Sequence, residues 1–140
     1  MILLDTNVVS EPSAAKPDAA VLRWFGQQNH GELFLSVMTV TELTLGVNLL
    51  PEGRRKQELV AKIDLLVGRF YQNRIVPVSL EIATKAGEIF ATTKRLRGEA
   101  QMADSLIAAT ALVHGFGIAT RNVKDFQHQG LRLINPWAMP

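Results

Sequence analysis

Short apolar runs alternate with longer amphipathic segments along this chain. The runs are apolar or β-branched and end at breaker residues, which is typical of strands; they cover residues 2–5, 32–37, 74–78, 117–120 and 131–136. The segments between them carry apolar residues at helical spacing and predict helices over residues 17–28, 39–50, 53–74, 79–98 and 101–115. Gly98 and Gly115 stand where the last two helices are expected to end.

This alternation predicts an α/β fold, in which a mainly parallel sheet of about five strands lies between two layers of helices. The chain of 140 residues has the length of one domain, so we expect residues 1–140 to form a single domain. In such sheets, ligands bind beyond the carboxyl ends of the strands, where loops lead into helices. We therefore expect the functional site at that edge.

An aspartate stands at this edge, at the end of the first expected strand. In the opening stretch "MILLDTNVVS", Asp5 follows Leu4 directly, although aspartate is among the side chains least often buried. A solvated turn acid does not need to follow an apolar strand without a spacer. The first strand is therefore predicted to be a rigid support that presents Asp5 to a site.

Four other polar side chains lie near the same expected edge as Asp5. Glu42 is placed in the first turn of the helix after the second strand, Asp104 lies early in the last helix, and Asn122 and Asp125 follow the fourth strand. Two carboxylates about 4 Å apart repel each other by roughly 4 kcal/mol at an effective dielectric near 20, so such a cluster needs a cation, protons or basic neighbours. Carboxylate and amide oxygens are the ligands preferred by Mg²⁺ and Mn²⁺.

Each of these residues also has a purely structural interpretation, which spacing alone leaves open. Thr39 and Glu42 have the spacing of a capping box. Asp104 suits the first turn of a helix, where the helix dipole favours a negative charge. Asn122 has the position of an N-cap.

The net charge and the composition of the chain give only weak evidence about its binding partners. The net charge of +2 and the pI near 9.2 weakly favour an anionic partner. Arg121 and Lys124 flank the acidic edge and are predicted to contact a phosphate backbone. The other basic clusters are predicted to be solvated faces of helices: Arg54, Arg55, Lys56, Lys94, Arg95 and Arg97.

Two absences in the sequence bear on location. The chain has no cysteine, which excludes a disulfide framework and a thiolate metal site. The longest uncharged run, residues 105–120, has 16 residues and is interrupted by His114 and two glycines, so it is too short and too broken to span a bilayer. We expect a cytoplasmic protein with no membrane association.

Five strings of residues, in order along nearly the whole chain, resemble a known family. They are "MILLDTNVVSE", "TVTELTLGV", "MADSLIAATAL", "ATRNVKDF" and "INPW". Together they resemble the PIN-domain ribonucleases, in particular the VapC and FitB-like toxins of prokaryotic type II toxin–antitoxin systems. The resemblance implies a PIN domain, with three layers (α/β/α), and a Mg²⁺- or Mn²⁺-dependent endoribonuclease.

The resemblance also implies roles for individual residues. Asp5, Glu42 and Asp104 match the family's catalytic, metal-binding acids, and Asn122 matches a fourth catalytic position that is often acidic. An amide there offers an oxygen but no charge, so the metal would be held less tightly or only one metal would bind, and Asp125 is a second candidate for the missing charge. Three residues match hydroxyl and amide groups that orient the acids or the water: Thr6, Asn7 and Thr120.

The resemblance also implies partners, and two competing functions can be compared with the one that it implies. It implies a homodimer, and a cognate antitoxin whose tail enters the active-site groove to form a hetero-oligomer. A phosphotransferase of the haloacid dehalogenase type is disfavoured, because it needs an acid two positions after Asp5, where this chain has Asn7. A catalytically weak or inactive nucleic-acid-binding module with the same fold is the alternative, because Asn122 replaces an acid.

Overall fold

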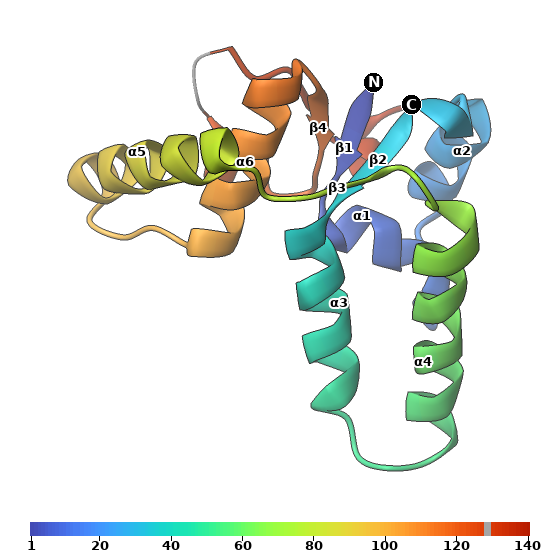
Figure 1. Ribbon diagram of the computed structural model, residues 1–140. Coiled ribbons are helices and arrows are strands. Elements are labelled where there is room, and N and C mark those ends of the chain that lie inside the picture. Colours follow the sequence, from blue (N-terminus) through green and yellow to red (C-terminus); the bar gives the residue numbers. More distant parts are fainter. Residues whose placement is uncertain (128–129) are drawn as a thin grey trace.

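The computed structural model describes residues 1–127 and 130–140, and in this part five parallel strands form one sheet with the order β3-β2-β1-β4-β5 (Figure 1). The strands are β1 (Ile2–Leu4), β2 (Leu33–Ser36), β3 (Ile75–Val76), β4 (Gly117–Ala119) and β5 (Leu133–Ile134). Each lies inside a run predicted from the apolar pattern. The predicted α/β fold with a parallel sheet is confirmed.

The strand order fixes where a site can form. The chain begins in the middle strand, builds β2 and β3 on one side of β1, and then adds β4 and β5 on the other side. The gap between β1 and β4 is therefore the point where the strand order reverses, which is where open parallel sheets bind ligands. Asp5 directly follows β1, and Thr120 directly follows β4.

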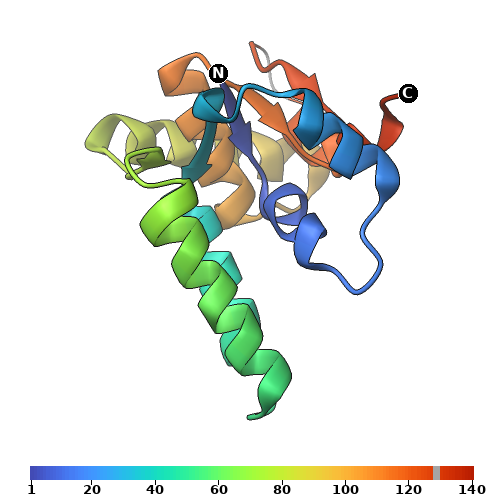
Figure 2. The same ribbon diagram turned by 90° about the vertical axis from the view of Figure 1, so that its right-hand side faces the viewer.

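Helices cover both faces of the sheet (Figures 1 and 2). They are α1 (Thr6–Ser10), α2 (Ala19–Gln27), α3 (Val37–Asn48), α4 (Arg54–Leu65), α5 (Leu80–Arg97) and α6 (Met102–His114). α5 and α6 end at Gly98 and Gly115, whose positive φ angles of 80° and 69° are the left-handed conformation that glycine adopts easily. Both predicted helix ends are confirmed.

Three details differ from the sequence pattern. α1 was not predicted, because the five residues after Asp5 lack a full helical repeat; the Asp5 side chain caps the helix instead. The predicted helix over residues 53–74 is α4 followed by a wider π turn at Leu66–Phe70. α3 begins at Val37 rather than after Thr39, because β2 passes into it without a loop.

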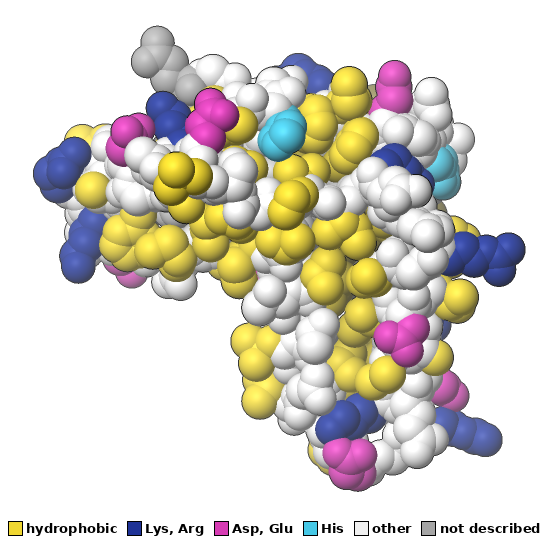
Figure 3. Space-filling view, viewed as in Figure 1, with side chains coloured by type: hydrophobic (Ala, Val, Ile, Leu, Met, Phe, Trp, Pro, Cys, Tyr) yellow, Lys and Arg dark blue, Asp and Glu magenta, His cyan; other side chains and the backbone are white. Residues whose placement is uncertain are grey.

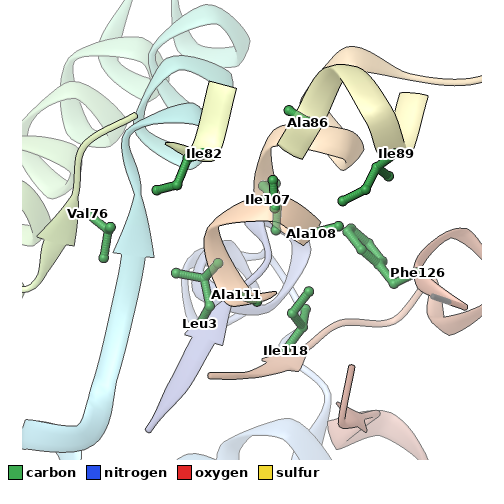
Figure 4. Packing of buried hydrophobic residues seen from close by; sticks show 11 residues of the cluster. Leu3, Val76, Ile82, Ala86, Ile89, Ile107, Ala108, Ala111, Ile118 and Phe126 are labelled. Atoms are coloured by element: carbon green, nitrogen blue, oxygen red, sulfur yellow. The ribbon is translucent and has the colours of Figure 1, made fainter. Parts of the chain in front are cut away.

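The core lies on both sides of β1. Leu3 packs with Ile107, Ile118 and Phe126 under α5 and α6, and Figure 4 shows these side chains converging. Leu4 faces the opposite layer and packs with buried residues that include Val8, Trp24 and Leu35. Because both leucines are fully buried, the end of β1 is held rigidly from two sides.

α3 and α4 form a hairpin of helices that projects from the sheet in both ribbon views (Figures 1 and 2). Within the described residues, no helix is both long enough and apolar enough to cross a membrane.

Candidate active site

Asp5 is a buried carboxylate with two fixed oxygens. Its side chain is 6% exposed. Oδ1 accepts the Thr6 main-chain N–H at 2.8 Å, and Oδ2 accepts the Thr120 hydroxyl at 2.7 Å. Burial raises the pKa of Asp5 above its ordinary value, although both hydrogen bonds act in the opposite direction. The protein therefore holds this acid in a defined position at an energetic cost.

Glu42 reaches the same place from α3. The Thr6 hydroxyl donates to Glu42 Oε1 at 2.7 Å, so Thr6 touches both acids, through its N–H and its hydroxyl. The predicted capping box is wrong: α3 is capped by Ser36, which accepts the Met38 N–H at 3.0 Å, and Glu42 lies in the second turn. Because the helix starts earlier than expected, Glu42 faces α1 rather than its own helix end.

Asp104 has the expected position in the first turn of α6. Its pKa is raised to about 6, first by burial and then by the negative charges of Asp5, Asp125 and Glu42. These charges act on Asp104 because the four carboxylates gather at one edge of the sheet. Repulsion of this kind is the effect expected when several carboxylates are brought together.

Asp125 is a fourth acid that the fold brings to the cluster. Asn122 begins a short 3₁₀ turn, η4 (Val123–Phe126), as expected for an N-cap, but its exposed side chain makes no capping hydrogen bond. Its main-chain N–H donates to the Thr120 hydroxyl oxygen at 3.0 Å. Asp125 is half-buried and raises the pKa of both Asp5 and Asp104.

The expected supporting residues form a chain of contacts around Asp5. Thr6 and Thr120 hydrogen-bond it directly. Asn7 accepts the Arg121 main-chain N–H through Oδ1 at 3.3 Å, and so joins α1 to the segment after β4. Cross-links of this kind fix the two strand ends relative to each other.

One basic residue, Arg97, is arranged differently from the expectation. The Arg121 guanidinium lies 5.2 Å from the centre of the Trp137 ring. Arg97, predicted to be on a solvated face, instead pairs with Asp125 at 3.5 Å and donates to the Lys124 carbonyl at 3.1 Å. The sequence carries no signal for this, because the contact depends on how the end of α5 packs against the segment after β4.

The donor set of the site suits a hard divalent cation. The four acids and the neighbouring Thr hydroxyls offer oxygen only, which is the preference of Mg²⁺ and Mn²⁺. Among the described residues, no three acidic or histidine side chains form a group that could by itself hold an ion. Mg²⁺ often binds proteins through one or two carboxylates and retains several waters. The arrangement therefore fits an ion held directly by one or two of these acids.

Known proteins resemble the chain over nearly its full length. The chain is 39% identical to the plasmid stability protein StbB of Pseudomonas syringae, over 98% of this chain and 99% of that protein. It is also 39% identical to the VapC ribonuclease Y4jK of Sinorhizobium fredii, over 98% of both chains. The toxin FitB of Neisseria gonorrhoeae is 36% identical over 98% of this chain and 99% of its own.

Solved structures agree. The structure of FitAB bound to a DNA fragment contains a chain with a TM-score of 0.90 and 35% identity, and the match covers 100% of this chain and 98% of that one. A VapBC2 complex from Rickettsia felis, bound to promoter DNA, matches with a TM-score of 0.72 and 26% identity, over 96% and 98% of the two chains. The sequence model of the PIN domain matches residues 2–130. The fold, the carboxylates at the switch point of the sheet and these matches together show that the chain belongs to the PIN-domain family.

Proposed function

We propose that this chain is a Mg²⁺- or Mn²⁺-dependent endoribonuclease and the toxin of a type II toxin–antitoxin module. The observation that carries the proposal is the gathering of carboxylates at one edge of the sheet. Thr6 hydrogen-bonds both Asp5 and Glu42, and Asp104 and Asp125 line one hollow. Such a cluster repels an RNA phosphate unless a cation compensates it. Relatives named as a VapC ribonuclease and as a toxin support the reaction and the role.

Asp5, Glu42 and Asp104 are the candidate ligands, of which one or two would hold the ion directly, and Asp125 is the acid that completes the charge. A bound divalent ion would neutralise the carboxylates, hold a phosphodiester oxygen and lower the pKa of a coordinated water. The protein itself contributes orientation. The Thr6 hydroxyl fixes one oxygen of Glu42, and the Thr120 hydroxyl fixes one oxygen of Asp5. Both carboxylates are therefore held in a defined orientation.

Proton handling falls to the acids that do not bind the ion. Asp104 has a pKa of about 6, close enough to neutral pH to exchange a proton with water. Glu42 is anchored through one oxygen by Thr6, and its second oxygen is suited to orienting a water molecule. An acid in this position contributes general-base catalysis, typically a factor of about 100 or more in rate.

A groove beside the site supports an antitoxin as partner. Between α3 and α4 lies a hollow of about 420 Å³ with Thr6 and Glu42 on its wall. The rest of its lining is largely apolar and includes Val47, Leu59 and Ile63, and hydrophobic side chains are visible between the two helices in Figure 3. An antitoxin segment with an apolar face, and a basic side chain for Glu42, has the matching chemistry. Similar chains occur in the FitAB and VapBC complexes.

The proposal includes a homodimer and a cytoplasmic location. α5 and the start of α6 leave Leu80, Leu96 and Met102 exposed, by 85%, 81% and 52%, and contact between two copies would remove such side chains from water. RNA and a cognate antitoxin are both encountered in the cytoplasm. Light scattering of the purified chain, with and without antitoxin, tests the assembly.

Mapped RNA ends from cells that express the chain test the enzyme. New, recurrent 5′ ends and growth arrest are expected for the wild type, and neither for the folded Asp5→Asn or Asp104→Asn variants. Full cleavage by the folded Asp5→Asn variant would contradict the assignment.

The alternative is a nucleic-acid-binding module without activity. It is less well supported, because the position of Asp125 replaces the charge that Asn122 lacks. Titration calorimetry with Mn²⁺ separates the two: the enzyme should bind the ion and lose affinity in Asp104→Asn. Intact RNA binding without Mn²⁺ binding would favour the alternative.

A further inference from the structure

Two adjacent hollows share a wall at the edge of the sheet. The first, the acidic hollow, measures about 60 Å³ and is lined by Asp104 and Asp125 among others. The second, the basic hollow, measures about 340 Å³ and is lined by residues that include Thr92, Thr93, Arg97, Lys124, Asp125 and Gln127. Thr93, Arg97 and Asp125 line both hollows. Arg97 therefore stands between Asp104 and a larger space whose lining combines cations, hydroxyls and an amide with Leu96 and the Asp125 carboxylate.

Arg97 is held in this wall by contacts that cross from α5 to η4. Nη1 donates to the Lys124 carbonyl oxygen at 3.1 Å, and Nη2 lies 3.5 Å from Asp125 Oδ1. A guanidinium carries five N–H donors, so these two contacts engage only part of it. The Arg97 side chain is 43% exposed. It is thus positioned by the protein and still accessible to a ligand.

The other groups in the basic hollow suit a sugar–phosphate backbone. Lys124 offers a second positive charge, and the Thr and Gln side chains offer hydroxyl and amide donors. These residue types account for most contacts that proteins make to phosphate and sugar oxygens. None of the described residues that line it is aromatic, whereas sites that bind the bases of single strands use aromatic stacking. The hollow is therefore suited to the backbone rather than to the bases.

We infer that the basic hollow binds the RNA backbone next to the cleaved bond, and that Arg97 and Lys124 each contact a phosphate there. This inference rests on the proposed function, in which the adjacent acids cleave RNA. Arg97 is then a substrate-positioning residue. It holds the RNA on one side of the acidic hollow, while its contact with Asp125 keeps the two hollows in a fixed position relative to each other.

A different explanation gives Arg97 no contact with RNA. Its charge would only offset that of Asp125, and its loss would weaken RNA binding through repulsion alone. The double variant Arg97→Ala/Asp125→Asn distinguishes these explanations. If Arg97 contacts a phosphate, the double variant binds RNA more weakly than Asp125→Asn; if Arg97 only offsets Asp125, the two bind alike.

The test is fluorescence anisotropy with a short labelled oligouridylate, using the full chain with Asp104→Asn as the parent to prevent cleavage. Arg97→Ala and Lys124→Ala should each weaken binding by about 3- to 10-fold. Each should also reduce the slope of log K against log salt by about 0.7, measured between about 50 and 200 mM KCl. Arg97→Lys keeps the charge and should restore the slope.

Arg54→Ala is the matched control, because Arg54 starts α4, is 91% exposed and does not line the basic hollow. It should leave affinity and slope close to those of the parent. Thermal midpoints verify that each variant is folded; if Arg97→Ala unfolds, Arg97→Gln in its place keeps the test decisive. Parent-like affinity and slope in both the Arg97 and Lys124 variants would overturn the inference. A separate result would contradict the proposed function itself: the wild-type chain with Mn²⁺ would leave total RNA uncut, whatever the result of the binding experiment.

Discussion

At the scale of single residues, the site depends on hydroxyl groups as much as on acids. Asp5 is buried and its pKa is raised, so its ionised form needs the two hydrogen bonds that it accepts. One comes from the main chain of Thr6, and the other from the side chain of Thr120. The Thr120 hydroxyl also accepts the Asn122 N–H, which fixes the direction in which it donates.

Thr120→Val should shift the pH dependence of cleavage. Loss of the hydroxyl removes a hydrogen bond that lowers the pKa of Asp5, so a higher pH is needed to ionise this acid. The acidic limb of kcat/KM against pH should move to higher pH, and kcat should fall by about 10-fold or more. Thr120→Ser keeps the hydroxyl and should retain the wild-type profile. Identical profiles for Val and Ser would show that the hydroxyl does not act on Asp5.

Asp104→Asn should stabilise the metal-free protein in a pH-dependent way. The folded-state pKa of about 6 lies above the ordinary value of 3.8, so the stability that Asp104 contributes is complete below pH 3.8 and is lost as pH rises through 6. The Tm of the Asn variant should therefore exceed that of the wild type increasingly over this window, and the difference should level off above it.

Added Mn²⁺ provides the control for this experiment. At pH 7.5 it should raise the Tm of the wild type, because it binds the ionised acids, and raise that of Asp104→Asn much less. Removal of the ion with EDTA should reverse the shift. A Tm difference that does not vary with pH would show that Asp104 does not titrate in this range.

At the scale of elements, the start of α3 carries a local defect. Ser36 takes the capping role, and Thr39 is buried in the first turn. Among the described residues, its hydroxyl is a buried side-chain group without a hydrogen-bond partner. A buried polar group of this kind costs about 1–3 kcal/mol in stability.

Thr39→Val should therefore stabilise the protein, by about 1 kcal/mol, since valine has nearly the same shape and no hydroxyl. Thr110→Val is the matched comparison: Thr110 is equally buried, but its hydroxyl donates to the Leu106 carbonyl at 2.7 Å. That variant should lose stability. Urea unfolding of both measures the difference, and a loss in Thr39→Val as large as in Thr110→Val would show that the Thr39 hydroxyl has a partner.

At the scale of the whole molecule, the groove that we propose for the antitoxin lies mostly outside the acidic site. Its wall includes Glu42, but most of its lining lies along the projecting hairpin, away from Asp5 and Asp104. A change in the hairpin can therefore affect antitoxin binding without altering the acids.

Ile63→Glu should abolish co-purification with the cognate antitoxin and leave RNA cleavage within about 2-fold of the wild type, because a buried charge without a partner is costly in an apolar interface. Val60→Glu is the control on the same helix: Val60 is 40% exposed and does not line the groove. Unchanged antitoxin binding by Ile63→Glu would place the interface elsewhere.

Much of the fold was predictable because it depends on local patterns. Apolar runs located all five strands, and glycines located the ends of α5 and α6. Asp5 and Asp104 were predicted to lie close together because a carboxylate at a strand end, and another in the first turn of a helix, fall on one edge of a parallel sheet. α1 was missed, because five residues carry too little of a helical repeat.

The partners of these acids were decided only by the tertiary structure. The resemblance had named Thr120 among the residues that orient the acids, but nothing in the sequence linked Arg97 to Asp125, 28 positions away. The sequence by itself determined the sheet, its functional edge and the acids that approach it, because burial and periodicity act locally. The packing of α5 against the segment after β4 determined that Arg97 stands beside Asp125, a contact that depends on distant parts of the chain.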